Sequence, residues 1–398
     1  MHVAILRRVP DFSASMDVYA DGLVKGLKTV RPSWIVSELH PAAPKNAAIK
    51  SLSGVQKYYE RYWRYPNRLR QVRADIFHII DHSDGYISGW LHRDQKPNVV
   101  TCHDLINLIQ PETFKGRARL PWLSMTLWKQ AVESMRQADH VITVSAHTKR
   151  DTIEQLAIMP QSITVVPNAV GSQFVVLSPE HRQNVRQKHA PESEAFCLLN
   201  IGSNNARKNI SAILLAVECL RDKGVPVRFW KAGADFTNEQ KQFIRDHNLQ
   251  NETSYLGKLS ETELIELYNA ADCLMAPSLY EGFGLTILEA MACGTPVITA
   301  NINAMPEVAG DAALLVDPTN IRDIARAVQK LYTQPELAKV LARRGLERVQ
   351  NFTWESTAEQ VAQVYEQILA QSKTGKDSAK LTQRPSQIVS NRPPNKNS

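Results

Sequence analysis

Residues 280–300 read YEGFGLTILEAMACGTPVITA, and this stretch decides the fold of the 398-residue chain. An apolar run at 273–277, which we expect to be a buried strand, comes directly before it. Gly282 and Gly284 then stand before an apolar helix expected to begin near Leu285. Glycines let a backbone approach a ligand closely, and the free amides at a helix N-terminus bind a diphosphate well. The stretch therefore predicts a strand, a tight loop and a helix, with an anion site at the loop.

Two carboxylates flank this loop. Glu281 precedes the turn, and Glu289 lies inside the expected helix. Eight residues of continuous helix would separate the two by about 12 Å, at a rise of about 1.5 Å per residue. That separation suits two groups that hold opposite ends of an extended ligand, each accepting hydrogen bonds from a diol, and it is too long for a shared metal ion.

The alternation of strand and helix extends along the whole chain. We expect strands at 2–9, 35–39, 76–80, 98–102, 141–145, 163–168, 195–201, 227–232, 253–256, 273–277, 296–300 and 312–316. Helical or polar segments separate them, and a polar stretch at 171–194 interrupts the rhythm. This pattern predicts the α/β class, with two doubly wound, Rossmann-like parallel sheets in series whose domains face a central cleft.

We place the domain boundaries by the same rhythm. The expected parts are a first domain at 1–175, a second domain at 176–352, a helix at 353–372 that returns to the first domain, and a disordered basic tail at 373–398. The tail lacks periodicity and is rich in Lys, Ser, Asn, Pro and Gln.

Composition limits the compartment and the partners. The five cysteines are odd in number and scattered, without metal-ligand spacing, so we expect reduced thiols in the cytoplasm and no metal site. The sequence predicts neither a secretory leader nor a membrane span. The net charge of +7 is concentrated in 57–73 and 373–398, so the folded body is not basic and no nucleic-acid partner is expected.

A second informative segment is GSNNARKN at 202–209, which follows the expected strand at 195–201 and opens a helix. A bound diphosphate carries negative charge, and without a metal ion that charge needs fixed cations and amides. Arg207 and Lys208 can supply these cations.

Together these segments resemble glycosyltransferase family 4, the retaining enzymes of GT-B architecture. Residues 280–300 look like the family's E-x7-E signature, and 202–209 resemble its donor-phosphate loop. The likeness covers nearly all of 98–370. It implies a metal-independent hexosyltransferase without a cofactor, whose donor is a nucleoside-diphosphate sugar of the mannose or glucose type. The acceptor would be a glycan or lipid-linked hydroxyl in cell-surface glycan or glycolipid synthesis.

The resemblance also implies roles for the parts of the chain, with 1–175 as the acceptor-side domain and 176–352 as the donor domain. Glu281, Gly282 and Phe283 would meet the donor sugar, and Glu289 would meet the ribose. The diphosphate would be held by Arg207, Lys208, Gly284, Leu285 and Thr286. His103 matches the family's H-D motif at the end of the 98–102 strand, so His103 and Glu281 are the expected catalytic residues, with Asp104 orienting the loop. Candidate acceptor contacts are Asp81, His82 and Ser13.

The segment 57–73 has two predicted faces. One face carries the aromatic residues Tyr58, Tyr59, Tyr62 and Trp63, and the other carries the cations Lys57, Arg61, Arg64 and Arg68. Aromatic residues beside cations suit an anionic membrane surface, which would make a cytoplasmic enzyme peripheral on the inner face of the membrane. An ordinary packed helix with a solvated face is an equally good interpretation.

Three other functions share parts of this pattern. A nicotinamide-dependent oxidoreductase would need G-x-G-x-x-G after a first strand, and neither half of the chain has it. A nucleotide-sugar epimerase of GT-B architecture would isomerise its donor without an acceptor. A non-catalytic nucleotide-sugar-binding protein would bind the donor and not turn it over.

Overall fold

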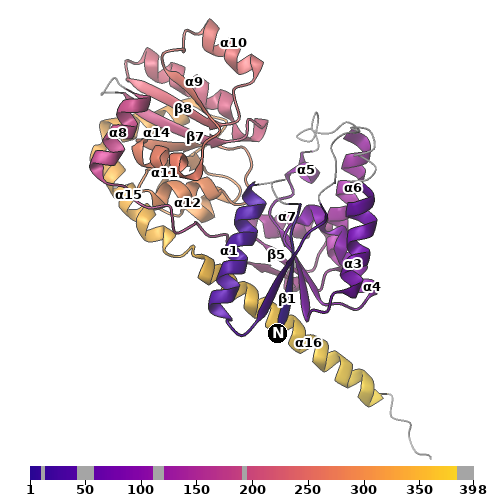
Figure 1. Ribbon diagram of the computed structural model, residues 1–398. Helices are drawn as coiled ribbons and strands as arrows, with labels where there is room; N and C mark the ends of the chain where they lie inside the picture. The colour runs from indigo at the N-terminus through magenta and orange to yellow at the C-terminus, as the bar shows by residue number, and fades with distance from the viewer. Residues whose placement is uncertain (10–13, 43–57, 111–120, 191–194, 383–398) are drawn as a thin grey trace, which may run out of the picture.

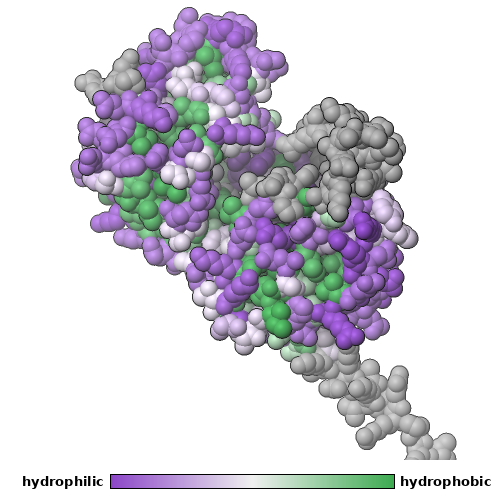
Figure 2. All heavy atoms as spheres, in the orientation of Figure 1, coloured by the Kyte–Doolittle hydropathy of each residue, from purple (hydrophilic) through white to green (hydrophobic). Residues whose placement is uncertain are grey.

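The computed structural model describes residues 1–9, 14–42, 58–110, 121–190 and 195–382. Two lobes, each built on one sheet, are joined along one side (Figure 1). The surface is hollowed where the two lobes meet (Figure 2).

The N-terminal lobe contains a six-stranded parallel sheet in the order β2-β1-β3-β4-β5-β6. Its strands are β1 His2–Leu6, β2 Ile35–Leu39, β3 Ile76–Ile79, β4 Asn98–Cys102, β5 His140–Thr143 and β6 Ile163–Val165. The central strands β3, β4 and β5 are buried along their whole length, which explains why they appear in the sequence as continuous apolar runs.

The C-terminal lobe repeats this plan with the order β12-β11-β10-β7-β8-β9. Its strands are β7 Phe196–Gly202, β8 Val227–Gly233, β9 Thr253–Gly257, β10 Cys273–Ala276, β11 Val297–Ala300 and β12 Ala313–Val316. In both sheets the strand order reverses beside the first strand, and in such sheets ligands bind beyond the carboxyl ends of the strands. The predicted architecture of two doubly wound parallel sheets is confirmed.

Helices cover both faces of each sheet. In the N-terminal lobe they are α1 Ala14–Val30, α3 Tyr65–Gln71, α4 Tyr86–Arg93, α5 Ile106–Ile109, α6 Pro121–Glu133 and α7 Ala146–Leu156. The C-terminal lobe has α8 Pro179–His189, α9 Ile210–Asp222, α10 Asn238–Asp246, α11 Glu261–Ala270, α12 Leu285–Ala292, α13 Met305–Ala309, α14 Ile321–Thr333 and α15 Pro335–Val349. In the described part of the chain, no helix has both the length and the apolar character that a membrane span needs.

The last helix, α16 (Trp354–Thr382), leaves the C-terminal lobe and lies against α1 of the N-terminal lobe (Figure 1). Trp354 explains why α1 carries a glycine at this contact, because a Cβ on Gly22 would lie 2.1 Å from the indole ring. Arg31 at the end of α1 forms ion pairs with Glu359 and Glu366. The helix therefore packs against the outside of the first lobe. We expect this contact to limit how far the two lobes can move apart.

The end of α16 differs from the sequence-based expectation. The predicted helix stopped at 372 and a disordered tail began at 373, whereas the helix continues to Thr382. The Lys, Ala and Leu residues in this stretch are compatible with helix, so a lack of apolar periodicity indicated an unpacked segment and not a break in the helix. The rest of the predicted tail, 383–398, lies outside the described residues.

Candidate active site

The loop between β10 and α12 meets the end of β4, and this contact joins the two lobes. At Gly282 an added Cβ would lie 1.9 Å from the carbonyl oxygen of His103 and 2.8 Å from Cβ of Asp104. Only glycine fits such a close approach of two backbones. The structure thus brings the E-x7-E loop and the H-D motif, which are about 180 residues apart in the chain, to one place.

Two hydroxyls of α7 fix the same loop. The carbonyl oxygen of Gly282 accepts hydrogen bonds from Ser145 at 2.7 Å and from Thr148 at 3.1 Å. Ser145 is also the N-cap of α7, because its hydroxyl oxygen accepts a hydrogen bond from the backbone amide of Thr148. The candidate donor-sugar loop is therefore held by the N-terminal lobe as well as by its own.

Glu281 lies between the two predicted phosphate cations. Its carboxylate is 2.6 Å from the Arg207 guanidinium and 2.7 Å from the Lys208 ammonium, and it also accepts a hydrogen bond from Ser278. Burial favours the protonated acid, but Lys208 and Arg207 outweigh it and lower the pKa of Glu281 to about 2. Glu281 is thus a carboxylate at neutral pH, ready to accept hydrogen bonds from sugar hydroxyls.

The start of α12 has the geometry of an anion site. Gly284 is its N-cap with φ +101°, and no side chain caps the helix. Within the described chain, no acceptor lies within hydrogen-bond distance of the amides of Leu285 and Thr286. The ring of Phe283 is buried in the core against Phe352, so its predicted contact with the donor sugar would come from its backbone.

Glu289 lies about one turn into α12. Its carboxylate accepts a hydrogen bond from the hydroxyl of Tyr268 on α11 at 2.6 Å. Burial raises the pKa of Glu289, and the Tyr268 hydroxyl opposes this shift. The hydroxyl occupies one carboxylate oxygen, so the other is left to accept from a diol. The sequence predicted Glu289 as a ribose contact and did not predict this tyrosine.

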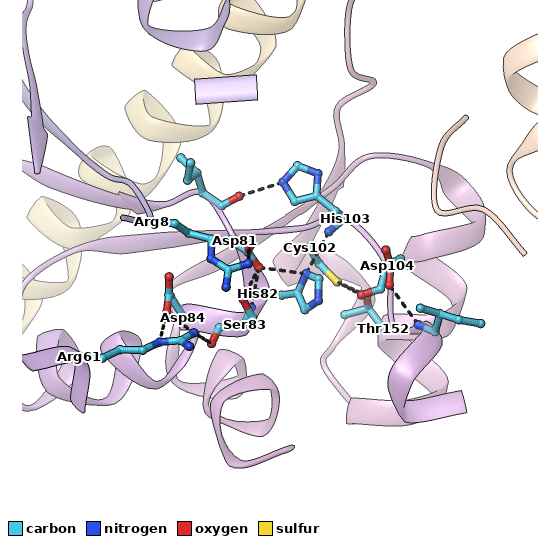
Figure 3. A network of polar contacts seen from close by, with 12 residues as sticks. Arg8, Arg61, Asp81, His82, Ser83, Asp84, Cys102, His103, Asp104 and Thr152 are labelled. Carbon is cyan, nitrogen blue, oxygen red and sulfur yellow. Dashed lines mark hydrogen bonds and ion pairs between the residues drawn. The ribbon is translucent and has the colours of Figure 1, made fainter. Parts of the chain in front are cut away.

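His103 is buried beside the contact between the lobes. Its Nε2 is 2.8 Å from the carbonyl oxygen of Ile80, and a carbonyl only accepts, so Nε2 carries the proton and Nδ1 is the acceptor (Figure 3). Burial lowers the pKa of His103, although Asp81 opposes this shift, so the neutral ring dominates at neutral pH. The Tyr19 ring meets the imidazole edge-on at 4.8 Å and restricts its rotation. Nδ1 can accept a hydrogen bond from a ligand hydroxyl.

The predicted acceptor residues belong to a polar network beside His103 (Figure 3). Both oxygens of the Asp81 carboxylate accept hydrogen bonds: one accepts from Arg8 at 2.8 Å, and the other accepts from the amide and hydroxyl of Ser83. His82 accepts from the backbone amide of His103 at 3.4 Å. Asp81 therefore orients Arg8 and Ser83, and its contact with an acceptor stays a prediction. Ser13 lies outside the described residues.

The same network corrects the expectation for Arg61. Its guanidinium points inward, donating to the carboxylate of Asp84 at 2.6 Å and to the carbonyl of Ser83 at 2.9 Å (Figure 3). It does not share a solvated face with Arg64, whose side chain is 62% exposed. A π-helical segment at Glu60–Arg64 shifts the helical register here, which a regular period of 3.6 residues could not anticipate. Lys57 lies outside the described residues.

One further contact between the lobes was not predicted. Asp151 on α7 accepts a hydrogen bond from the hydroxyl of Tyr280, the residue before Glu281, at 2.5 Å. The ring of His147 lies 3.3 Å from the same carboxylate and touches the Tyr280 ring. Both Tyr280 and Asp151 are buried. The partners are 129 residues apart, so no local pattern in the sequence reveals the pair.

Known family models match both lobes. A model described as Glycosyltransferase Family 4 matches 31–174, and one described as Glycosyl transferases group 1 matches 181–348. In the described part of the chain, no three His, Cys, Asp or Glu side chains gather as metal ligands.

Similar proteins and structures agree with these models. The glycogen synthase of Mycobacterium tuberculosis is 31% identical over 306 residues, which are 74% of this chain and 69% of that protein. Serotype-specific mannosyltransferase WbdA of Escherichia coli is 27% identical over 76% of this chain, but the match spans only 38% of WbdA. The structure of sucrose-phosphate synthase from Thermosynechococcus elongatus superposes with a TM-score of 0.73 at 22% identity, over 93% of this chain and 99% of that one. With its E-x7-E loop, its R-K pair and its H-D motif meeting between two lobes, the chain belongs to glycosyltransferase group 1, family 4, of GT-B architecture.

Proposed function

We propose that this chain transfers a hexosyl group from a nucleoside-diphosphate sugar to an acceptor hydroxyl. The observation that carries the proposal is the contact of Gly282 with His103, which places Glu281, held by Arg207 and Lys208, beside the H-D motif of the other lobe. Similarity to a mannosyltransferase and to a glycogen synthase favours mannose or glucose as the sugar.

The geometry supports a division of roles. In the reaction the bond between the anomeric carbon and the phosphate oxygen breaks, a bond to the acceptor oxygen forms, and the acceptor proton passes to the departing diphosphate. Arg207, Lys208 and the free amides of α12 would stabilise that diphosphate, so we expect no requirement for a metal ion. Glu281 and Nδ1 of His103 would accept hydrogen bonds from sugar hydroxyls. We expect retention of the anomeric configuration, as the family resemblance implies.

A donor screen tests the proposal. GDP-mannose, UDP-glucose and related donors would be incubated with mono- and disaccharide acceptors and lipid-linked glycans, with released nucleoside diphosphate and the product anomer as readouts. Glu281→Gln keeps the shape and removes the charge, so it is the matched inactive variant. If no donor releases a nucleoside diphosphate and no nucleoside diphosphate binds, the proposal is contradicted. Sugar isomerisation without an acceptor would favour the epimerase, and binding without turnover would favour the non-catalytic protein.

We also infer a membrane-proximal acceptor from the exposed face of 58–64. Tyr59 and Trp63 are 55% and 57% exposed, and Arg64 extends beside them. Such a face suits an anionic lipid surface and the synthesis of cell-surface glycans. Sedimentation with phosphatidylglycerol vesicles should lose binding in Trp63→Ala with Arg64→Glu but not in the control Arg70→Glu, whose side chain pairs with Asp94. Equal binding of both variants and the parent would place the acceptor contact elsewhere.

A further inference from the structure

A buried lysine lies under the candidate phosphate loop. Lys231 is 0% exposed and sits near the end of β8, where it pairs in register with Asn200 of β7. Its ammonium donates to the carbonyl of Gly202 at 3.0 Å and to the carbonyl of Ala232 at 2.9 Å. Gly202 is also the first residue of the predicted donor-phosphate loop. The ammonium therefore binds the backbone carbonyl at the start of this loop.

The second lysine of the site lies on the other side of the same glycine. A Cβ placed on Gly202 would be 3.6 Å from Cε and 3.8 Å from Nζ of Lys208. The ends of β7 and β8 also lie in close contact, because a Cβ on Gly233 would lie 2.5 Å from the Gly202 carbonyl oxygen. The two lysines thus lie close to the same backbone position, Gly202. This position is at the carboxyl ends of the strands, where ligands of this fold bind.

The buried charge of Lys231 is not neutralised by the protein. In the described residues no carboxylate lies within ion-pair distance of its ammonium. Asp235 is the nearest acidic influence, but its carboxylate is paired with Lys241. A buried cation with carbonyl partners alone is costly, and an apolar side chain in this strand would avoid that cost. The position gains from a cation only when an anion arrives nearby.

We propose that Lys231 is a third cation of the donor site, which fixes the Gly202 loop through its carbonyl and adds positive charge beneath the diphosphate of a bound nucleotide. This inference rests on the proposed function, since it assumes that the ligand is a nucleoside diphosphate. Lys231 acts through the loop, so it is a positioning and charge-balancing residue and does not take part in bond making.

The proposal has a thermodynamic consequence. Burial and, to a smaller extent, the neighbouring Lys208 lower the pKa of Lys231 to about 8 against the opposing effect of Asp235. About half of the molecules therefore lack this charge at pH 8 before ligand binds. A bound diphosphate favours the protonated ammonium, so binding should take up about half a proton at pH 8, and affinity should fall by up to about tenfold per pH unit above that. Neither Glu281 nor Tyr268 takes up this proton, because the pKa of Glu281 is lowered to about 2 and burial raises the pKa of Tyr268 well above its ordinary value.

Calorimetry with GDP and UDP tests this directly. Titrations at pH 8 in two buffers of different ionisation enthalpy measure the protons taken up, and titrations up to pH 9.5 measure the change in affinity of the parent protein. Lys231→Met should abolish the uptake and weaken binding by roughly tenfold, the size of one charge-assisted contact. Lys231→Arg keeps the charge and cannot titrate, so it should bind within a few-fold of the parent without uptake.

The outcomes separate the two proposals. If neither nucleotide binds and no donor is turned over, the proposed function fails. If a nucleotide binds but the parent takes up no proton and its affinity does not change above pH 8, Lys231 has no such role. Binding by a folded Lys231→Met as tight as the parent's would overturn it equally. Because the parent's pH series needs no variant, a folding defect in either substitution does not prevent the test.

Discussion

Tyr280→Phe removes one hydroxyl from the contact between the two lobes and changes nothing else in the ring. In the parent this hydroxyl donates to the buried carboxylate of Asp151, whose other close neighbour is His147. A hydrogen bond to a charged group contributes about 1.5–3 kcal/mol, and more of that is felt when the charged partner stays buried without a donor. The substitution should therefore weaken the contact that holds the Glu281 loop on α7.

The cost converts into an activity range. If the contact stabilises only the arrangement in which both lobes meet the donor, a loss of about 1.5–3 kcal/mol lowers kcat/KM by up to about 10- to 100-fold. In the proposed site the nucleoside diphosphate contacts the C-terminal lobe, so its affinity should change much less than kcat/KM. Initial-rate kinetics and calorimetry on the same preparation measure both quantities.

Matched variants isolate the pair. Tyr332→Phe removes a hydroxyl that has no hydrogen-bond partner in the described chain, from a tyrosine that is 40% exposed, so it should behave as the parent. Asp151→Asn combined with Tyr280→Phe should lose little more than either change alone, because both remove one interaction. If Tyr280→Phe retains kcat/KM within twofold of the parent, or if the two losses simply add, the contact does not position the Glu281 loop.

Other consequences are open to simpler measurements. Glu289→Gln should raise KM more than it lowers kcat, since the ribose does not change during reaction, whereas Lys208→Met should lower kcat by roughly 10²–10³-fold; the reverse pattern would exchange their roles. Glu281 stabilises the fold fully above its ordinary pKa of 4.5 and loses that effect only as pH falls through about 2, so an acid limb of kcat above pH 5 would have to come from another group. Turnover should survive EDTA; loss that manganese restores would show a metal site. Truncation after Asn351 should lower the melting temperature and truncation after Ser372 should not, because Ile368 is the last side chain of α16 that is described as buried; equal melting temperatures would contradict this.

Local patterns were sufficient for the frame and for part of the site. Buried strands such as β10 appear as apolar runs because both faces are covered, and the loop after β10 could be placed because a ligand-binding turn needs glycines there. Contacts between distant segments left weaker signals. The pairing of Tyr280 with Asp151 depends on how the lobes meet, and the inward turn of Arg61 depends on Asp84. Lys231 did leave a trace, as the one charged side chain inside the apolar end of β8, FWKAG, but only its buried setting gives that charge a meaning.

The position of Glu281 explains how the donor site can hold cations in place before a ligand arrives. Arg207 and Lys208 would repel each other if they were left alone in a partly buried loop, and their long side chains would be free to move into solvent. The carboxylate between them neutralises part of this charge and fixes both side chains by hydrogen bonds, so the cost of ordering them is met during folding. These three side chains together carry one net positive charge. This is smaller in magnitude than the negative charge of a diphosphate, which increases as the sugar leaves. A protonated Lys231 beside the same loop would add a second positive charge. Its protonation and nucleotide binding should therefore be measured as one linked equilibrium.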